Sequence, residues 1–243
     1  MRLGLGPIAL AGTTRASLEA LAKAAVAASF DSVWVAESRA GGVGGGLAAA
    51  AFLAQLVPIR VGAVLDGGLY HPLHMAEDIA IADVTSQGRV EVLLRGAPEE
   101  HVRLLLAALS GAHMRIDGPT LRVPARLEAN QPSPDALALN PRPAQAVVPV
   151  WVDEAMEAIG RDLGVGVAAA WRAGTPAPAP SGRWPGLLLC PGDVTAGDLL
   201  RAAGEAAAYF LVDASSPENV RSAGRRLVGP LRMPGFPDWI NQQ

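Results

Sequence analysis

Short apolar runs alternate with longer amphipathic segments along most of the chain. Eight of these runs have the length and composition of buried strands. They lie at Leu3–Leu10, Val33–Ala36, Arg60–Leu65, Val90–Leu94, Val147–Val152, Val165–Trp171, Gly186–Cys190 and Ala208–Val212. Continuous apolar runs are typical of strands that are covered on both faces, as in parallel sheets. The pattern therefore predicts an α/β protein with eight parallel strands.

A helix is expected after every predicted strand except the sixth. The expected helices begin at Thr13 or Thr14, at Leu47, near His71-Pro72, at Pro98, at Glu154, at Ala196 and at Pro217, the last with Ser215 or Ser216 as its cap. After the sixth strand, residues 172–185 are rich in Pro, Ala, Gly and Ser, which excludes an ordinary crossover helix.

This order of elements predicts a (β/α)8 TIM barrel in which the helix after strand six is missing or replaced by a Pro/Ala-rich loop. An open doubly wound sheet is the alternative. However, neither Gly4-Leu5-Gly6 nor Gly42–Leu47 completes the glycine pattern of a dinucleotide-binding fold.

A single barrel domain over residues 1–243 accounts for the predicted elements. Six prolines between Gly111 and Ala146 predict an extended excursion over residues 111–146, which separates two halves of the chain. Residues 233–243 form an apolar, proline-rich tail that contains Phe236 and Trp239. Because exposing such side chains is unfavourable, the tail is expected to dock on the barrel or on a partner subunit.

Composition and charge exclude several functional classes. The 243 residues are 50% hydrophobic and 18% charged, with a net charge of −3 and one cysteine. The chain is too apolar for a disordered protein, too poor in cysteine for a disulfide scaffold and not basic enough for a strong nucleic-acid binder. No apolar stretch reaches the ~20 residues of a membrane span, and no secretory signal region is evident. A cytoplasmic protein without nucleic-acid or membrane partners is therefore expected.

Several motifs occur in the order and at the spacing of a known family. They are Phe30–Glu37, Ile59–Gly62, His71-Pro72 with Glu77 and Asp83, Gln87–Arg89, Leu94–Gly96, Asp117-Gly118, Asn140–Gln145 and Val148–Val152. Together they resemble the bacterial luciferase-like family of flavin-dependent monooxygenases and deazaflavin-dependent oxidoreductases. The resemblance implies an eightfold barrel that binds FMN, or alternatively a deazaflavin, at the carboxyl ends of its strands.

The resemblance also implies roles for residues that follow the predicted strands. Arg95 matches an arginine that meets the cofactor phosphate, and a planar, permanently charged guanidinium suits this role. An ion pair between Arg95 and Glu37 is the alternative. Ala63 and Val64 match the segment behind the flavin ring, and Trp171 can either stack on that ring or pack in the core.

Two positions depart from the family. In bacterial luciferase a catalytic histidine follows the glutamate that matches Glu37, but Ser38 occupies that position here, and serine does not titrate as a base near neutral pH. Family members commonly have hydroxyl-bearing residues or glycine after the fifth strand, where this chain has Asp153-Glu154. Two carboxylates would repel a cofactor phosphate unless Asp153 caps the following helix. Asp153 and Glu154 are nevertheless included among the expected cofactor-binding residues.

Other residues are candidates for chemistry at the barrel mouth. The expected catalytic or pocket-lining residues are Glu37, Ser38, Asp66 and Tyr70, since each follows a strand at the end where barrel enzymes carry their sites. His71, His74 and Glu77 can share a helix face, but an exposed helix start is expected there and not a metal site. Cys190 is expected to be a buried, inert thiol.

Three functional hypotheses follow. The first is a flavin-dependent oxidoreductase or monooxygenase that acts on a small organic substrate with reduced flavin from a separate reductase. The second is a catalytically silent barrel that acts as a partner subunit or ligand carrier. The third is a cofactor-free catalyst that uses the vacated flavin pocket. The resemblance further implies a homodimer, or a heterodimer with a relative, formed through the early helices.

Overall fold

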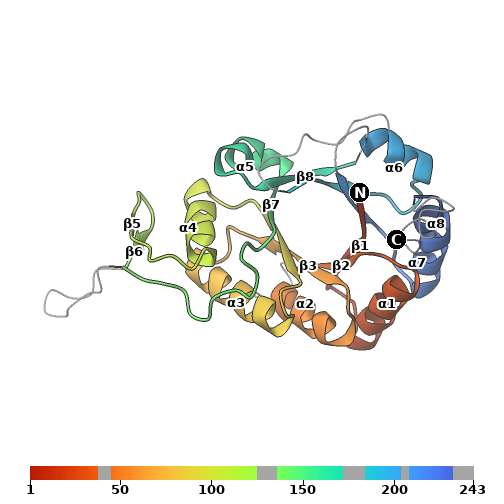
Figure 1. Ribbon diagram of the computed structural model, residues 1–243, viewed down its shortest axis with the longest axis horizontal. Coiled ribbons are helices and arrows are strands. Elements are labelled where there is room, and N and C mark those ends of the chain that lie inside the picture. The colour runs from red at the N-terminus through yellow and green to blue at the C-terminus, as the bar shows by residue number, and fades with distance from the viewer. Residues whose placement is uncertain (38–44, 125–135, 172–183, 204–207, 232–243) are drawn as a thin grey trace, which may run out of the picture.

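The computed structural model describes residues 1–37, 45–124, 136–171, 184–203 and 208–231. Eight parallel strands close into a barrel in the order β1-β10-β9-β8-β7-β4-β3-β2 (Figure 1). They are β1 (Arg2–Ala9), β2 (Ser32–Ala36), β3 (Arg60–Asp66), β4 (Val90–Arg95), β7 (Val150–Asp153), β8 (Gly166–Ala170), β9 (Gly186–Cys190) and β10 (Ala208–Val212). The predicted (β/α)8 barrel is confirmed, and the alternative open sheet is wrong.

Helices cover the outside of the barrel. They are α1 (Arg15–Ala27), α2 (Gly45–Leu56), α3 (Pro72–Thr85), α4 (Glu99–Leu109), α5 (Glu157–Leu163), α6 (Ala196–Ala203), α7 (Pro217–Ala223) and α8 (Gly229–Leu231). A short 3₁₀ helix, Glu154–Met156, precedes α5, and a π-helical turn, Gly224–Val228, joins α7 to α8. Among the described helices, none is long and apolar enough to cross a membrane.

Side-chain caps start several helices where the sequence predicts them. The Thr14 side chain accepts from the Ser17 amide at the start of α1, and Ser216 accepts from the Asn219 amide at the start of α7. The caps are thus Thr14 and Ser216, and not their alternatives. His71 caps α3 through a bond from the Leu73 amide, followed by a proline at the first helical position.

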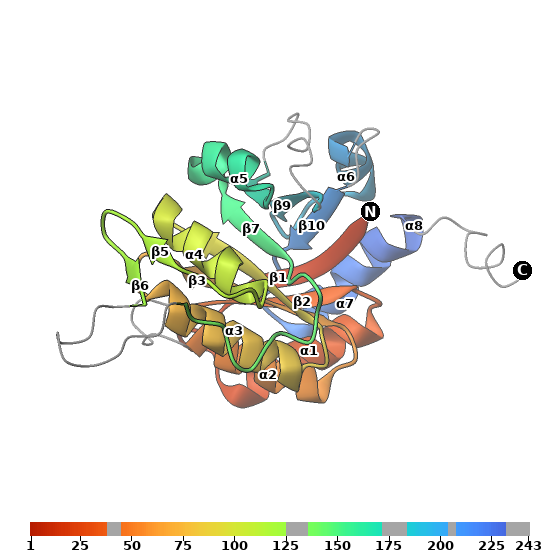
Figure 2. The same ribbon diagram turned by 60° about the vertical axis from the view of Figure 1, so that its left-hand side comes forward.

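The excursion after α4 contains a small hairpin instead of extended chain alone. Strands β5 (Ile116–Asp117) and β6 (Arg122–Val123) pair antiparallel next to α4 (Figure 2). Glu100 on α4 holds the hairpin turn by accepting from the Thr120 amide at 3.2 Å and the Leu121 amide at 3.1 Å. The predicted loop after the sixth strand, residues 172–185, lies outside the described residues except for Trp184 and Pro185. The predicted docking tail, residues 233–243, lies wholly outside them.

The bore of the barrel is filled by side chains. We call this set the bore cluster: Trp34, Val64, Leu93, Trp151, Ala168, Leu187, Tyr209 and Leu211. The Trp151 ring lies 5.8 Å from both the Trp34 and the Tyr209 ring centroids, in edge-to-face contacts. These rings fit because glycines face them across neighbouring strands. A Cβ at Gly62 would lie 2.0 Å from Trp34, and one at Gly166 would lie 2.3 Å from Trp151.

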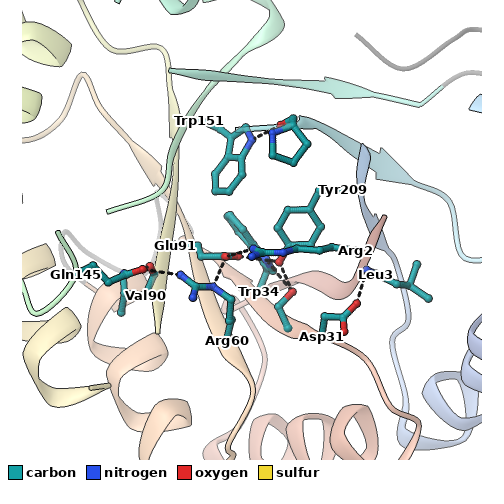
Figure 3. Close-up of polar contacts among 12 residues, drawn as sticks. Arg2, Leu3, Asp31, Trp34, Arg60, Val90, Glu91, Gln145, Trp151 and Tyr209 are labelled. Carbon is teal, nitrogen blue, oxygen red and sulfur yellow. Dashed lines mark hydrogen bonds and ion pairs between the residues drawn. The ribbon is translucent and has the colours of Figure 1, made fainter. Parts of the chain in front are cut away.

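A buried polar network lies below the rings, at the amino ends of the strands (Figure 3). Glu91 is fully buried and pairs with Arg2 at 3.0 Å and with Arg60. The Tyr209 hydroxyl donates to Glu91 at 2.7 Å, and the Trp34 indole donates to that hydroxyl at 3.0 Å. Burial, and then the charge of Glu91, raises the pKa of Tyr209 well above its usual range, so the phenol keeps its proton.

The same network ties the end of the excursion to the barrel. Arg60 donates to the Gln145 side-chain oxygen at 2.8 Å, and the Gln145 side-chain amide donates to buried Asp83 at 2.7 Å and to the Val90 carbonyl at 2.8 Å. The Gln145 backbone amide also donates to Asp83, at 2.8 Å. Asp83 and Gln145, which belong to the family motifs, are therefore structural anchors far from the barrel mouth.

Replacing Gly62 with alanine should destabilise the protein, because the new Cβ meets the Trp34 ring and a tryptophan in a filled bore has little room to move. We expect Gly62→Ala to cost about 3 kcal/mol and to lower Tm by roughly 6–12 °C in a thermal melt. Gly197→Ala is the matched control, because the nearest described atom to its Cβ would be a Thr195 oxygen at 3.9 Å. Equal melting temperatures for the two variants would contradict the tight packing in the bore.

Replacing Glu91 with glutamine should be costly, because it leaves Arg2 and Arg60 without a buried countercharge. We expect Glu91→Gln to lower the free energy of unfolding by about 2–3 kcal/mol in a denaturant titration, because the side chains of Arg2 and Arg60 are 44% and 25% exposed and water compensates part of the lost charge. Glu157→Gln removes an exposed helical ion pair with Arg161 and should cost no more than about 0.5 kcal/mol. A Glu91 variant as stable as this control would show that the buried pair is dispensable.

Candidate active site at the carboxyl end of the barrel

Three charged residues lie side by side where strands β3, β4 and β7 end. Asp66 is the register partner of Arg95, and Leu94 is the partner of Val152, which sets Arg95 beside Asp153. Each of the three follows a bore-cluster residue, Val64, Leu93 or Trp151, by two positions. Because side chains alternate along a strand, this row is directed to the bore side of the sheet. We call Asp66, Arg95 and Asp153 the rim row.

Arg95 is the cation of the rim row. Its residue is exposed, and its guanidinium makes no hydrogen bond or ion pair within the part of the chain that the structure describes. The alternative ion pair between Arg95 and Glu37 does not form. The charge of Arg95 therefore faces the barrel mouth with an acidic neighbour on each side and is bonded to neither.

Asp153 does not act as the predicted helix cap. It occupies the residue before the 3₁₀ helix, but its side chain makes no capping bond. Its Oδ2 accepts instead from the Gly96 amide, at 3.1 Å, because the short loop after β4 approaches the end of β7. Its Oδ1 is buried, and no residue in the described ranges hydrogen-bonds to it. Glu154 is exposed in the first turn that follows.

Glu37 and Tyr70, two of the predicted catalytic residues, are brought together. The Tyr70 hydroxyl donates to Glu37 Oε1, and the Gly46 amide donates to the same oxygen at 3.3 Å. Glu37 thereby joins the end of β2, the start of α2 and the loop after β3. Asp66 accepts from the Gly68 amide at 3.2 Å, within its own loop. Ser38 lies outside the described residues.

The remaining predicted cofactor residues are divided between the two faces of the sheet. Val64 belongs to the bore cluster, whereas Ala63 packs in the outer core between strands and helices. Trp171 also packs against the outer core, and its buried indole nitrogen has no hydrogen-bond partner among the residues that the structure describes. Of these three side chains, Val64 is the one that the structure places in the bore.

Two of the candidate histidines, His71 and His74, lie at the start of α3 and make local contacts there. Burial, and then the neighbouring His74, lowers the pKa of His71, which suits its role as a neutral acceptor at the start of α3. His74 Nδ1 lies 3.3 Å from Glu77 Oε2, three residues further along the same helix. Within the described ranges, no group of three or more His, Cys, Asp or Glu side chains is arranged to hold a metal ion.

Sequence reasoning did not identify the Glu91 network. The available signal was a glutamate inside an otherwise apolar strand, Val90–Leu94, because a charge in a buried strand needs a partner. Its partners Arg2, Arg60 and Tyr209 come from three other strands, so no local pattern connects them. The network lies at the amino ends of the strands, the side of such barrels that serves stability.

An apolar cavity of about 280 Å³ also lies near the amino ends of the strands. Its lining includes Leu109 on α4, Leu163 on α5, Val148 and Trp184. None of its described lining residues is charged. It lies away from the rim row and contributes nothing to the candidate site.

The parts of the chain that form β1 to β4 match a known family. Residues 4–99 match the family model described as "Luciferase-like monooxygenase". This match covers less than half of the chain, and it confirms the resemblance expected from the motifs over that segment. No curated protein matches the chain.

Solved structures share the fold across a larger part of the chain. A monooxygenase, RslO1 from Streptomyces bottropensis, has a TM-score of 0.63 at 13% identity, covering 93% of this chain and 97% of that one. The coenzyme F420-dependent tetrahydromethanopterin reductase of Methanopyrus kandleri has a TM-score of 0.55 at 16% identity, covering 70% of this chain and 55% of that one.

A third similar structure is the oxygenating constituent of 3,6-diketocamphane monooxygenase from Pseudomonas putida, in complex with FMN. Its TM-score is 0.50 at 16% identity, covering 70% of this chain and 57% of that one. This chain thus spans little more than half the length of the reductase and of the diketocamphane enzyme. At these identities the likeness shows the barrel fold, and function has to be argued from the site.

The Cys190 thiol should be unreactive in the folded protein. Burial raises its pKa to about 12. We expect a thiol reagent at pH 8 to label the native protein far more slowly than protein unfolded in guanidinium, which is the control. Stability should be unaffected by this thiol below its unfolded pKa of about 8.5 and should fall as the pH rises from there toward 12. Rapid labelling of the native protein would contradict a buried thiol.

Proposed function

We propose that the protein is a luciferase-like oxidoreductase or monooxygenase that acts on a small organic substrate with a flavin-type cofactor. The observation that carries the proposal is the charged rim row above the apolar bore cluster, at the carboxyl end of a barrel whose first four strands match the luciferase-like family. This is the end at which barrels of this architecture bind their ligands.

The residues present suit the ring of a flavin-type group. Val64, Leu93 and Ala168 of the bore cluster give the mouth an apolar floor, and the ring of such a cofactor is a flat, largely apolar body. When bound, the cofactor supplies hydride transfer or, for a flavin, reaction with oxygen. FMN and a deazaflavin are the two candidates.

The chain's own residues then shape the mouth. Glu37 and Tyr70 hold the start of α2 and the loop after β3 in fixed positions, so that Asp66 and Arg95 keep their places on the rim. Arg95 offers a positive charge to an anionic group of cofactor or substrate. Asp66 and Tyr70 are proposed to line the pocket and, with Glu37, to hold or transfer protons at their carboxylate and phenol oxygens.

We also propose that the protein pairs with a second copy or a relative, and that a separate reductase supplies reduced flavin. The support for pairing is an apolar strip on α3, where Ile81 and Val84 are 51% and 47% exposed. Isolated apolar side chains on a surface are ordinary, but two that are one turn apart on an early helix fit an interface.

A cofactor titration tests the proposal. We expect purified protein to bind a flavin or a deazaflavin saturably, with a dissociation constant on the order of 1–100 μM, measured by quenching of ligand fluorescence and by a shift of its visible spectrum. Protein unfolded in urea is the control for nonspecific quenching. If neither ligand binds at millimolar concentration, the hypothesis of a silent barrel or a cofactor-free catalyst replaces this one.

A further inference from the structure

We infer that the loop after β3 is a pH-sensitive part of the barrel mouth, held at both ends near neutral pH and released at its His71 end when that ring gains a proton. This loop, residues 67–71, runs from the end of β3 to the start of α3 and contains Tyr70. The inference goes beyond the proposed function, because it concerns the chain's own groups and requires no bound cofactor.

The first end of the loop is held by contacts that persist in acid. The Gly67 amide donates to the Arg95 carbonyl at 2.8 Å, and His101 Nδ1 lies 3.3 Å from the Gly67 carbonyl. Because a carbonyl only accepts, His101 donates through Nδ1, and it keeps this proton when its ring becomes positively charged. Gly67 also packs closely on the loop after β4, where an added Cβ would lie 2.4 Å from the Ala97 side chain. Acidification therefore leaves this end in place.

The other end of the loop is held by a bond that a proton breaks. The Leu73 amide donates to His71 Nδ1 at 3.3 Å, and this bond caps the start of α3. A ring nitrogen that has taken up a proton cannot accept a hydrogen bond, so protonation of Nδ1 removes the cap. It also places a positive charge at a helix N-terminus, where the macrodipole disfavours cations. The neutral ring is thus the form that fits the folded loop.

The charges around His71 favour the same neutral form. Burial lowers its pKa, and the described charges that lower it further are those of His74, whose ring centroid lies 5.7 Å away, and of His101 on α4. Helix α2, which also packs against α3, has no titratable side chain. The stability that the neutral ring contributes is therefore fully present above the unfolded histidine pKa of about 6.5. It is lost as the pH falls from there toward the lower pKa of the folded state.

The carboxylates of this region have hydrogen bonds or ion pairs with other groups. Glu77 lies beside His74, Glu100 accepts from the amides of the hairpin turn, and Asp66 accepts from its own loop. The described charges that act on the His71 ring are consequently of one sign, and all of them oppose its protonation.

Loss of the cap reaches the mouth through Tyr70, the residue before His71. The Tyr70 side chain is 6% exposed, and its hydroxyl donates to Glu37 at the end of β2. The His71 carbonyl accepts from the Met75 amide at 3.1 Å, which forms the first turn of α3. When this turn frays, the backbone that positions the Tyr70 ring is no longer fixed. The contact between Tyr70 and Glu37 is thereby weakened.

An NMR titration of the intact protein from about pH 8 to about pH 5 tests the inference. We expect the pKa of His71 to lie below that of His113, which is exposed and lies outside the described helices. The protection of the Leu73 amide against hydrogen exchange, corrected for the intrinsic rate, should fall about fivefold toward acid pH, as the loss of a helix cap gives. The Gly67 amide should keep its protection.

His71→Asn is the decisive variant, because asparagine is a good helix cap and does not titrate. Its Leu73 amide should keep the same protection at all these pH values. His74→Asn removes a like charge and should raise the pKa of His71. His113→Asn is the matched control, and it should leave the titration of His71 and the protection of Leu73 unaltered.

The two tyrosines of the chain report whether the change reaches the mouth. The ring signals of Tyr70 should shift with the midpoint of His71. The ring signals of Tyr209, which is fully buried in the bore, should stay constant and serve as the internal control.

Four results would each overturn the inference. They are a His71 pKa at or above that of His113, a Leu73 amide whose protection is independent of pH, a His71→Asn variant with the pH dependence of the unaltered protein, and Tyr70 signals that do not follow His71. Because every measurement is made without a cofactor, these results leave the proposed function standing. Failure to bind a flavin or a deazaflavin overturns the proposed function and leaves this inference standing.

Discussion

Filling the bore of a closed eight-stranded barrel is the constraint on which the rest of this structure depends. The bore must be packed by the inward side chains of all eight strands. Here the three largest fully buried side chains of the described residues, Trp34, Trp151 and Tyr209, lie in the bore and meet at edge-to-face angles. Large rings on some strands require the smallest residues on others, and Gly62 and Gly166 supply that space.

The aromatic packing separates two polar regions with different roles. Below it, Glu91 is neutralised by Arg2 and Arg60 and hydrogen-bonded by Tyr209, so its charge is satisfied within the protein. Above it, neither the Arg95 guanidinium nor Asp153 Oδ1 has a hydrogen-bond partner among the described residues. The buried network is complete and holds strands together. The mouth is incomplete, and this is the property expected of a site that receives a ligand.

Several site residues could be anticipated from the sequence because a barrel puts the ends of its parallel strands on one rim. Asp66, Arg95 and Asp153 each follow an apolar run, so their common location follows from the fold. The role of Asp153 could not be anticipated in the same way. Its carboxylate can accept a hydrogen bond either from an amide of the helix that it precedes or from the Gly96 amide of another loop. The distance between the two loops in space determines that the bond to Gly96 forms.

The sequence by itself determined the barrel, the strand and helix order and the identity of the residues at the rim, because apolar runs and helix caps are local patterns. The tertiary structure alone decided which face each side chain takes and which charges meet. Ala63 and Val64 are neighbours in the chain but lie on opposite faces of the sheet, and Glu91 finds its partners on strands that are up to 118 residues away. Such pairings depend on strand register and barrel closure, which no local pattern contains.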